Sequence, residues 1–238
     1  AALFFVRRMR ERGEIKPAEP GDEVLSWKAL MIFYIPLALT SFVVLAIRPI
    51  ITAGIARAPL PLESLAVWPV IHSFIFLFTS ISLSYQEVVV TLLKTDDDYT
   101  ALRKFTLVVA AVLFTLFYLV PITRFDTIWF RFVMGLPEDL MGFVNTPLFI
   151  LPFMPLFLTL VTWFRGVQIK RRKTVNITKG VLINGIVTTG LIFAGAFLLP
   201  VAGVITAALT ISIAHGCESV YLFRKTMSQN RELLSIER

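Results

Sequence analysis

Six long apolar stretches, separated by shorter polar segments, run along this chain. They cover residues 27–56, 62–93, 101–122, 140–164, 175–199 and 201–223. A transmembrane helix needs about 20 predominantly apolar residues, and each stretch is long enough to supply one. The pattern therefore predicts an all-α polytopic membrane protein with six transmembrane helices.

Prolines divide two of the predicted helices. Pro36 and Pro49 fall in the first, and Pro147, Pro152 and Pro155 fall in the fourth. Because proline removes an intrahelical hydrogen bond, we expect a kink in the first helix and no straight rod in the fourth.

Two connections next to the third helix carry signals of their own. The three aspartates at 96–98 precede that helix, where they are expected to cap its start rather than bind a metal. The segment 125–132 that follows it is rich in Phe and Trp. Such rings suit the lipid interface, so we expect a short interfacial helix there.

Small residues recur four positions apart in the last two helices, which predicts close contact between helix backbones. The pairs are Gly190 with Ala194, Gly203 with Ala207, and Ser212 with Gly216.

Charge is distributed very unevenly about the six stretches. Of the 23 Lys and Arg residues, 19 fall on one side, and the other side keeps Arg48, Arg57, Arg124 and Arg131. The positive-inside rule then places both termini in the cytoplasm. We expect the protein in the cytoplasmic (plasma, or inner) membrane. The net charge of +7 is thus explained by topology and by attraction to membrane lipid, not by nucleic-acid binding.

The chain begins with an apolar run, residues 1–6, followed by Arg7 and Arg8. We interpret residues 1–24 as the end of a preceding transmembrane helix plus a cytoplasmic linker. Residues 25–223 would form the six-helix lobe and 224–238 a cytoplasmic tail. A cloning or processing artefact is the alternative; on the first interpretation, an N-terminal lobe is missing.

The second predicted helix is the richest in polar residues. At 100° per residue, Ser73, Ser80, Ser84 and Glu87 fall within an arc of about 60°. His72, Thr79 and Gln86 form a second stripe beside the first. Such stripes are typical of a water-accessible cavity between helices. Alternatively, the hydroxyls bond their own backbone, although this would not explain Glu87 or His72.

Position along the helices sorts the polar residues into two groups. Arg48, His72 and Asn145 would lie near the outer side, whereas Glu87, Glu218, Asn184 and Arg165 would lie in the inner third. Non-functional alternatives stay open for each residue. Arg48 could snorkel to headgroups, and His72 could be a packed histidine. The glutamates could pair with interfacial Lys94, Arg224 or Lys225.

Enzyme signatures are missing from the sequence. We find no G-x-S-x-G elbow, no phosphate-binding glycine loop and no His/Cys metal spacing, and His72 and His215 are far apart. We therefore expect no catalytic residues, no metal site and no cofactor.

Several short matches resemble a known superfamily of transporters. They are the proline-broken start of the first helix at 33–40, Arg48-Pro49-Ile50, Gln86-Glu87, Arg165 with the segment 170–174, and Glu218-Ser219. Over about residues 27–223, the chain resembles the second lobe of the multidrug and polysaccharide flippase (MATE-like) superfamily, and most of all the progressive ankylosis protein family.

The resemblance implies a two-lobe, alternating-access transporter that exports small anions such as pyrophosphate, citrate or nucleotide. Arg48 would contact the anion, Glu87 and Glu218 would serve gating or proton coupling, and His72, Ser80, Ser84 and Asn184 would line the cavity. Two features depart from the superfamily: the first and fourth helices lack Asp and Glu, and Cys217 separates Gly216 from Glu218. The alternatives are a lipid-linked saccharide flippase, a multidrug exporter, or a membrane scaffold subunit that transports nothing.

Overall fold

The computed structural model describes residues 27–236, which form helices joined by short connections and contain no strand. The elements are α2 (Trp27–Ile55), α3 (Pro61–Leu92), α4 (Asp96–Ile122), α5 (Phe125–Thr127), the π-helix η1 (Ile128–Val133), the 3-10 helix η2 (Glu138–Leu140), α6 (Gly142–Ile150), α7 (Phe153–Lys170), α8 (Thr174–Leu198) and α9 (Gly203–Ile236). The all-α fold is as expected.

The chain divides into two compact units, residues 1–37 and 38–238. Of the first unit, only residues 27–37 are described, and they form the first turns of α2. The expected end of a preceding helix, at residues 1–6, lies outside the described residues. All contacts reported below are within the second unit.

Several helices are long and apolar enough to cross a membrane. Four satisfy this by themselves: Pro61–Leu92, Asp97–Ile122, Thr174–Leu198 and Gly203–Ser228. The pair Glu138–Ile150 and Phe153–Lys170 counts as a fifth if the two helices form one bent span. The apolar stretch of α2, Thr40–Ile55, is shorter. The protein is therefore an apolar helical bundle with four or five candidate spans in the described residues, and the sixth stays a prediction.

The structure tests the effect of proline in the fourth predicted helix. The fourth predicted span is bent by 41° between α6 and α7, where Pro152 follows Leu151. A straight rod is thus absent there, as the prolines predicted. α2 is one continuous helix that includes both Pro36 and Pro49, and the kink expected in it stays a prediction.

The start of α4 confirms the expected capping role for one of the three aspartates, Asp98. The Thr95 hydroxyl accepts a hydrogen bond from the backbone N–H of Asp98 at 3.2 Å. In return, the Asp98 carboxylate accepts one from the backbone N–H of Thr95 at 2.8 Å. This reciprocal capping box fixes where the helix begins.

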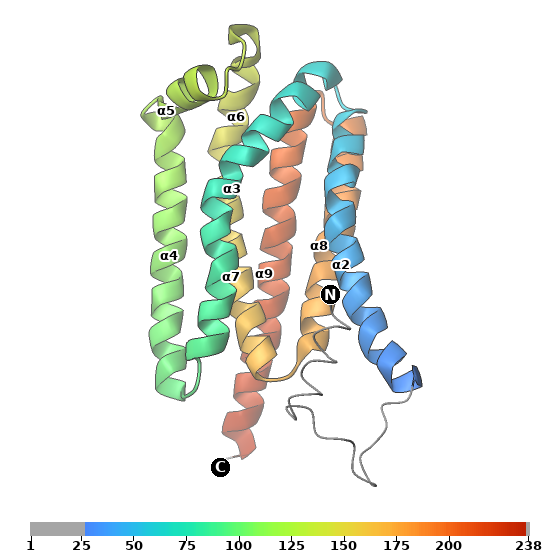
Figure 1. Ribbon diagram of the computed structural model, residues 1–238, viewed down its shortest axis with the longest axis vertical. Coiled ribbons are helices and arrows are strands. Elements are labelled where there is room, and N and C mark those ends of the chain that lie inside the picture. The colour runs from blue at the N-terminus through green and yellow to red at the C-terminus, as the bar shows by residue number, and fades with distance from the viewer. Residues whose placement is uncertain (1–26, 237–238) are drawn as a thin grey trace, which may run out of the picture. The chain divides into compact units, whose positions relative to one another are not determined.

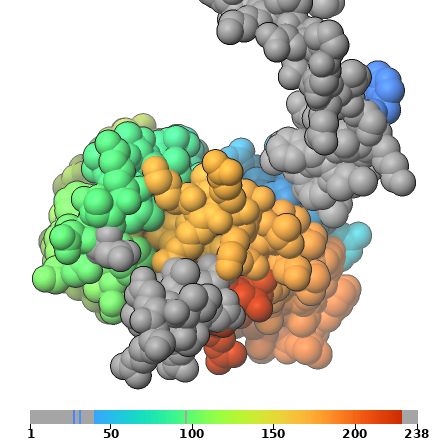
Figure 2. Space-filling model, turned by 90° about the horizontal axis from the view of Figure 1, so that it is seen from below, coloured from blue at the N-terminus to red at the C-terminus, as the bar shows by residue number. Residues whose placement is uncertain are grey.

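Both ends of the second unit are clear in Figure 1. The connections 93–95 and 171–173 lie at one end, together with the last turns of α9; we call this the basic end because it carries Lys94 and the cations of 170–173. The connections 56–60 and 199–202 lie at the other, which we call the far end. Seen from the basic end, residues of α3 and α4 (green) lie beside those of α7 and α8 (orange) (Figure 2), and Lys170 Nζ donates to the carbonyl of Val90 at 3.3 Å.

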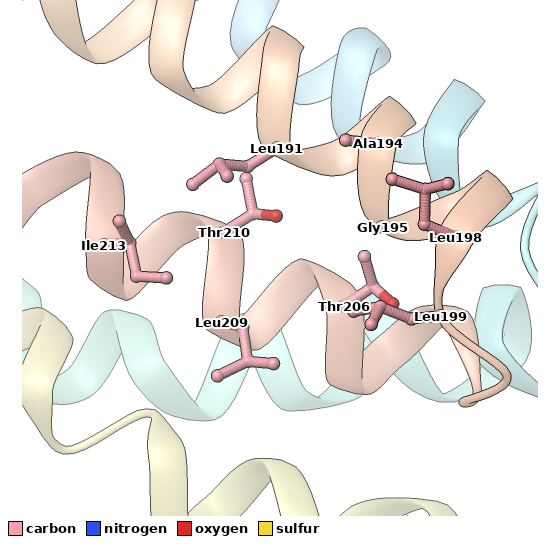
Figure 3. Close-up of a pocket in the computed structure, with 9 residues that line it drawn as sticks. All are labelled: Leu191, Ala194, Gly195, Leu198, Leu199, Thr206, Leu209, Thr210 and Ile213. Carbon is pink, nitrogen blue, oxygen red and sulfur yellow. The ribbon is translucent and has the colours of Figure 1, made fainter.

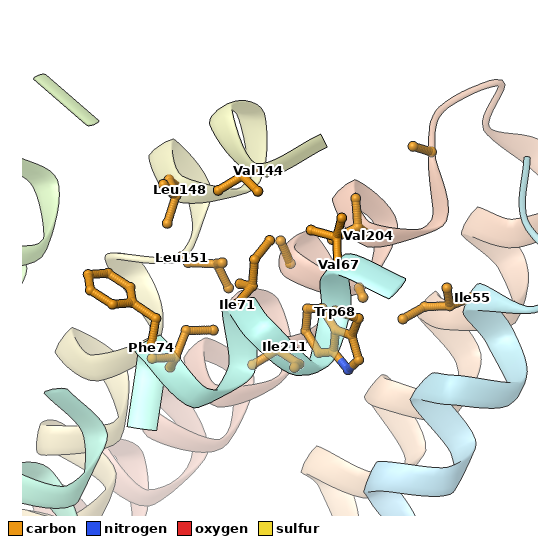
Figure 4. Packing of buried hydrophobic residues seen from close by; sticks show 14 of the residues in the cluster. Ile55, Val67, Trp68, Ile71, Phe74, Val144, Leu148, Leu151, Val204 and Ile211 are labelled. Atoms are coloured by element: carbon orange, nitrogen blue, oxygen red, sulfur yellow. The ribbon is translucent and has the colours of Figure 1, made fainter. Parts of the chain in front are cut away.

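Two apolar clusters hold the unit together. The larger lies toward the far end, where α3, α6 and α9 meet (Figure 4). Its labelled members include Val67, Ile71, Phe74, Leu148 and Ile211, all almost fully buried. The smaller cluster lies toward the basic end and is formed by α3, α4, α7 and α9.

Phe130 corrects the expectation that the ring-rich segment 125–132 lies wholly at the lipid interface. It is fully buried, and its ring packs edge-on against Phe74 with centroids 5.3 Å apart. Phe125 and Phe132 are exposed. A short helix resting on the end of the bundle has an inner side and an outer side, so it buries the Phe130 ring, half-buries Trp129 and exposes Phe125 and Phe132.

The expected small-residue contacts occur in α9 but not at Gly190. A Cβ on Gly203 would lie 3.0 Å from the Ile55 carbonyl oxygen, and one on Gly216 would lie 3.3 Å from the Phe157 ring. A Cβ on Gly190 would meet nothing within 4 Å, because this residue lines a hollow between α2 and α8. The prediction of a close backbone approach at Gly190 is therefore wrong for the described residues.

Gly166 lets α7 approach α3, and we predict that Gly166→Ala destabilises the bundle. The new Cβ would lie 2.6 Å from Cγ1 of Val89 and 2.8 Å from its Cβ. Such overpacking costs about 1–3 kcal/mol. Thermal unfolding of the purified chain in detergent measures the effect. Gly190→Ala is the matched control, because its Cβ has room; an equal loss of stability in both variants would contradict the packing argument.

Candidate functional site

A buried ion pair connects α7 to α9 inside the apolar bundle. Arg165 donates to Oε1 of Glu218 through Nε at 3.0 Å, and its Nη2 contacts the same oxygen. The Glu218 side chain is 1% exposed and that of Arg165 is 21% exposed. An ionisable group at such a depth is costly, so it is normally paired or directed to a cavity.

Asn184 of α8 completes this arrangement. Its Nδ2 donates to Oε2 of Glu218 at 3.1 Å, and its Oδ1 accepts a hydrogen bond from the Thr188 hydroxyl at 3.4 Å. Both carboxylate oxygens of Glu218 are thereby occupied. We call Arg165, Asn184, Thr188 and Glu218 the buried network. Since one carboxylate binds partners on two other helices, it fixes the depth of α7, α8 and α9 relative to one another.

His215 lies next to the buried network. It precedes Glu218 by three residues on α9, which places the two on neighbouring positions of the same helix surface. It is close enough to Glu218 and Arg165 to interact with both electrostatically, and its Nδ1 lies 2.9 Å from the carbonyl oxygen of Ile211. The site therefore combines a carboxylate, a guanidinium, an amide and an imidazole.

A second polar network ties the same three helices together nearer the basic end. Nε2 of Gln168 donates to the Thr226 hydroxyl at 3.1 Å, and Nδ2 of Asn176 donates to Oε1 of Gln168 at 3.1 Å. Sequence reasoning missed Gln168, although an amide one turn beyond the end of the apolar stretch 140–164 was a visible signal. These bonds stiffen the basic end of the bundle below the buried network.

The structure brings together three of the four residues expected in the inner third. Arg165, Asn184 and Glu218 meet as described, whereas Glu87 is exposed on α3. Glu218 pairs with Arg165 rather than with an interfacial lysine or arginine. The expected inner cluster of two carboxylates is therefore wrong, because Glu87 points away from the side of α3 that faces α7.

On the outer side, Arg48 and His72 interact electrostatically across α2 and α3. Arg48 is exposed, and His72 is half-buried with its ring 6.0 Å from that of Trp68. Asn145, the third residue expected here, is exposed on α6. The outer group thus has two members in proximity, both near the exterior of the unit.

The polar stripe of α3 lies along the middle of its exposed side. Ser73, Ser84 and Glu87 are exposed and Ser80 is half-buried. The hydroxyls also bond their own helix: Ser73 donates to the Pro69 carbonyl at 2.9 Å, Ser80 to Leu77 at 2.9 Å and Ser84 to Ser80 at 3.0 Å. This agrees with the alternative interpretation for the hydroxyls, but it leaves Glu87 unexplained.

Hollows between the helices are mainly apolar. One of about 240 Å³ lies between α8 and α9 near the far end (Figure 3), and among its nine lining residues only Thr206 and Thr210 carry hydroxyls. Another, between α2 and α8, is lined by residues such as Phe42, Ile47 and Leu182. Neither has a charged group to bind an anion. Within the described residues, no three His, Cys, Asp or Glu are grouped so that they could hold a metal.

Comparison with known proteins gives no relative. No family model matches the chain, and neither a curated protein nor a solved structure is significantly similar to it. The resemblance to the MATE-like superfamily therefore stays a prediction from short motifs.

We predict that Arg165→Gln destabilises the protein strongly. The variant leaves the Glu218 carboxylate buried with Asn184 but without its cation, and breaking a buried pair costs about 3–5 kcal/mol. Thermal unfolding in detergent should show a large drop in midpoint, and the neutral pair Arg165→Gln/Glu218→Gln should recover most of it.

The control is the exposed pair of Arg131 and Glu138, 3.1 Å apart with side chains 46% and 77% exposed. Arg131→Gln removes a solvated pair worth at most about 1 kcal/mol, so its midpoint should barely change. Failure of the double variant to recover would show that the buried network does not act as a pair.

Proposed function

We propose that this chain is one lobe of a membrane transporter that exports small anionic metabolites by alternating access. The observation that carries the proposal is the exposure of Arg48, Ser73, Ser84 and Glu87 on helices that are otherwise apolar. Contact with lipid chains is unfavourable for the charged Arg48 and Glu87, so a water-filled cavity or another part of the transporter would cover them.

The positions of the polar residues on α3 support a single polar face that borders a cavity. The stripe of α3 has exposed apolar residues on both sides, with Phe76 and Leu83 along one edge and Ile81 and Val88 along the other. A helix that borders a cavity carries this order, since its central line faces water and its edges contact neighbouring apolar surfaces. Simple exposure to lipid would favour an apolar central line.

Arg48 is the residue best suited to bind an anion. A guanidinium presents a planar set of donors that matches carboxylate and phosphate. Arg48 is exposed, near His72, and no acidic partner is described for it. Pyrophosphate, citrate and nucleotides all carry groups that it could bind.

The buried network is proposed to couple the helices during transport. Its two ions and one amide connect α7, α8 and α9, so any change in the charge of Glu218 would release Arg165 and alter how those helices pack. Glu87, on α3, would act separately at the basic end, which we propose faces the cytoplasm together with the C-terminus.

Two other functions remain as competitors. A lipid-linked saccharide flippase or multidrug exporter would use the same lobe with a different substrate. A scaffold subunit without transport would place Arg48 and Glu87 against lipid headgroups, where long charged side chains can reach water.

We predict that Arg48→Gln strongly reduces transport of the anion that the protein exports. The substitution removes the charge but keeps a polar side chain, so at least a tenfold loss is expected from losing a charge-assisted bidentate contact. The measurement is efflux of labelled pyrophosphate, citrate and ATP from vesicles that contain the gene product. Arg131→Gln, also at the far end, should retain transport. No transport of any of the three by the unmodified protein would withdraw the anion assignment.

A second test asks whether the α3 stripe meets water. In a Cys217→Ser background, Ser84→Cys should react readily with a membrane-impermeant thiol reagent, whereas Ile81→Cys, on the edge of the same exposed side, should react at least several-fold more slowly. Equal, slow labelling of both positions would support a lipid-facing stripe and the scaffold alternative.

A further inference from the structure

A groove between α4, α7 and α9 differs from the other hollows in having a cation at one end. Its volume is about 330 Å³. Most of the wall is apolar, with Leu107, Phe157, Leu160, Val220 and Phe223 among the lining residues. The polar part comes from Tyr99, Arg103, Thr106, Ser219 and Thr226.

Helix direction orders these residues along the groove. Tyr99 and Arg103 are in the first two turns of α4, at the basic end, and Leu107 lies one turn deeper. On α9, Thr226 lies toward the basic end and Ser219 lies about 10 Å deeper. The cation of the groove therefore lies near the basic end, where a span would leave the membrane. Most of its apolar wall lies deeper in the bundle.

Aromatic residues mark the same level. The Tyr99 and Trp163 rings line the groove and lie 5.3 Å apart. Such rings favour the headgroup region of a bilayer. Arg103 is exposed, and no carboxylate partner is described for it. A cation at the mouth of an apolar groove is complementary to a phospholipid, which carries an anionic headgroup at the end of its acyl chains. Basic pockets between transmembrane helices bind such headgroups.

We propose that this groove binds one anionic phospholipid of the leaflet at the basic end, with Arg103 contacting the phosphate and an acyl chain lying along Phe157, Leu160 and Phe223. The inference is independent of the transport proposal, because it rests on a different face of the unit. Phe164 and Ser219 line the groove and adjoin Arg165 and Glu218 in sequence, so a bound lipid would pack directly behind the buried network.

The test measures lipid binding by the purified full chain with native mass spectrometry after detergent exchange. Phosphatidylglycerol and phosphatidylcholine are the probes. We expect one phosphatidylglycerol to be retained in preference to phosphatidylcholine. Arg103→Gln should weaken its retention about fivefold, the effect of removing one cation near an anionic lipid. Lys104→Gln is the matched control: it is the adjacent exposed cation, it does not line the groove, and it should leave retention unchanged.

A third variant separates the groove from surface charge. Val220→Trp places a large ring in the groove and keeps every cation, so it should also reduce retention. Three results would overturn the proposal: equal loss in the Arg103 and Lys104 variants, no loss in Arg103→Gln, or undiminished retention in Val220→Trp. Thermal unfolding of each variant without lipid distinguishes lost binding from lost fold.

Discussion

The carboxylate of Glu218 imposes the strongest constraint on this structure. It is buried inside a bundle where a lone charge is very costly, and its two oxygens are occupied by Arg165 from α7 and Asn184 from α8. Three helices must therefore keep one relative depth. The Gln168 contacts repeat the same connection nearer the basic end. If one helix slid by one turn, the Glu218 carboxylate would lose its partners and stay buried without them. The polar bonds therefore fix the register of these helices, which apolar packing alone would not determine.

Elsewhere the helices are held by close fit. In a bilayer, apolar side chains gain little by leaving lipid for another helix, because both surroundings are apolar. Between α3 and α7, Gly166 receives the Val89 side chain, and the hydroxyls of Ser82 and Thr159 meet at 2.8 Å. Between α3 and α4, the Tyr85 hydroxyl lies 2.8 Å from that of Thr106. Each contact uses a glycine or a pair of hydroxyl groups on facing helices. They explain why the helices pack as one unit although many apolar side chains remain on its exterior.

Apolar length predicted the helices well because spanning a bilayer sets both length and composition, and the proline cluster predicted the bend before α7. Depth along each span also grouped Arg165, Asn184 and Glu218 correctly. Direction around a helix was harder to predict: Glu87 shares the depth of that group but faces away from it. The 100° periodicity defines a side of α3 without naming the neighbour on that side. For the same reason, the burial of Phe130 and the open space at Gly190 could not be predicted without the packed neighbours.

The two sides of α3 divide the unit into faces with different surroundings. Its inner side, with Ser82, Tyr85 and Val89, packs on α7 and α4, and the lipid groove lies farther along that direction, between α4, α7 and α9. The polar stripe lies on the opposite side of the helix. A surface that suits an acyl chain and a surface that exposes Glu87 cannot both face bulk lipid at equal cost. Water or protein against the polar side would remove this cost, and the transporter lobe proposed above would supply it.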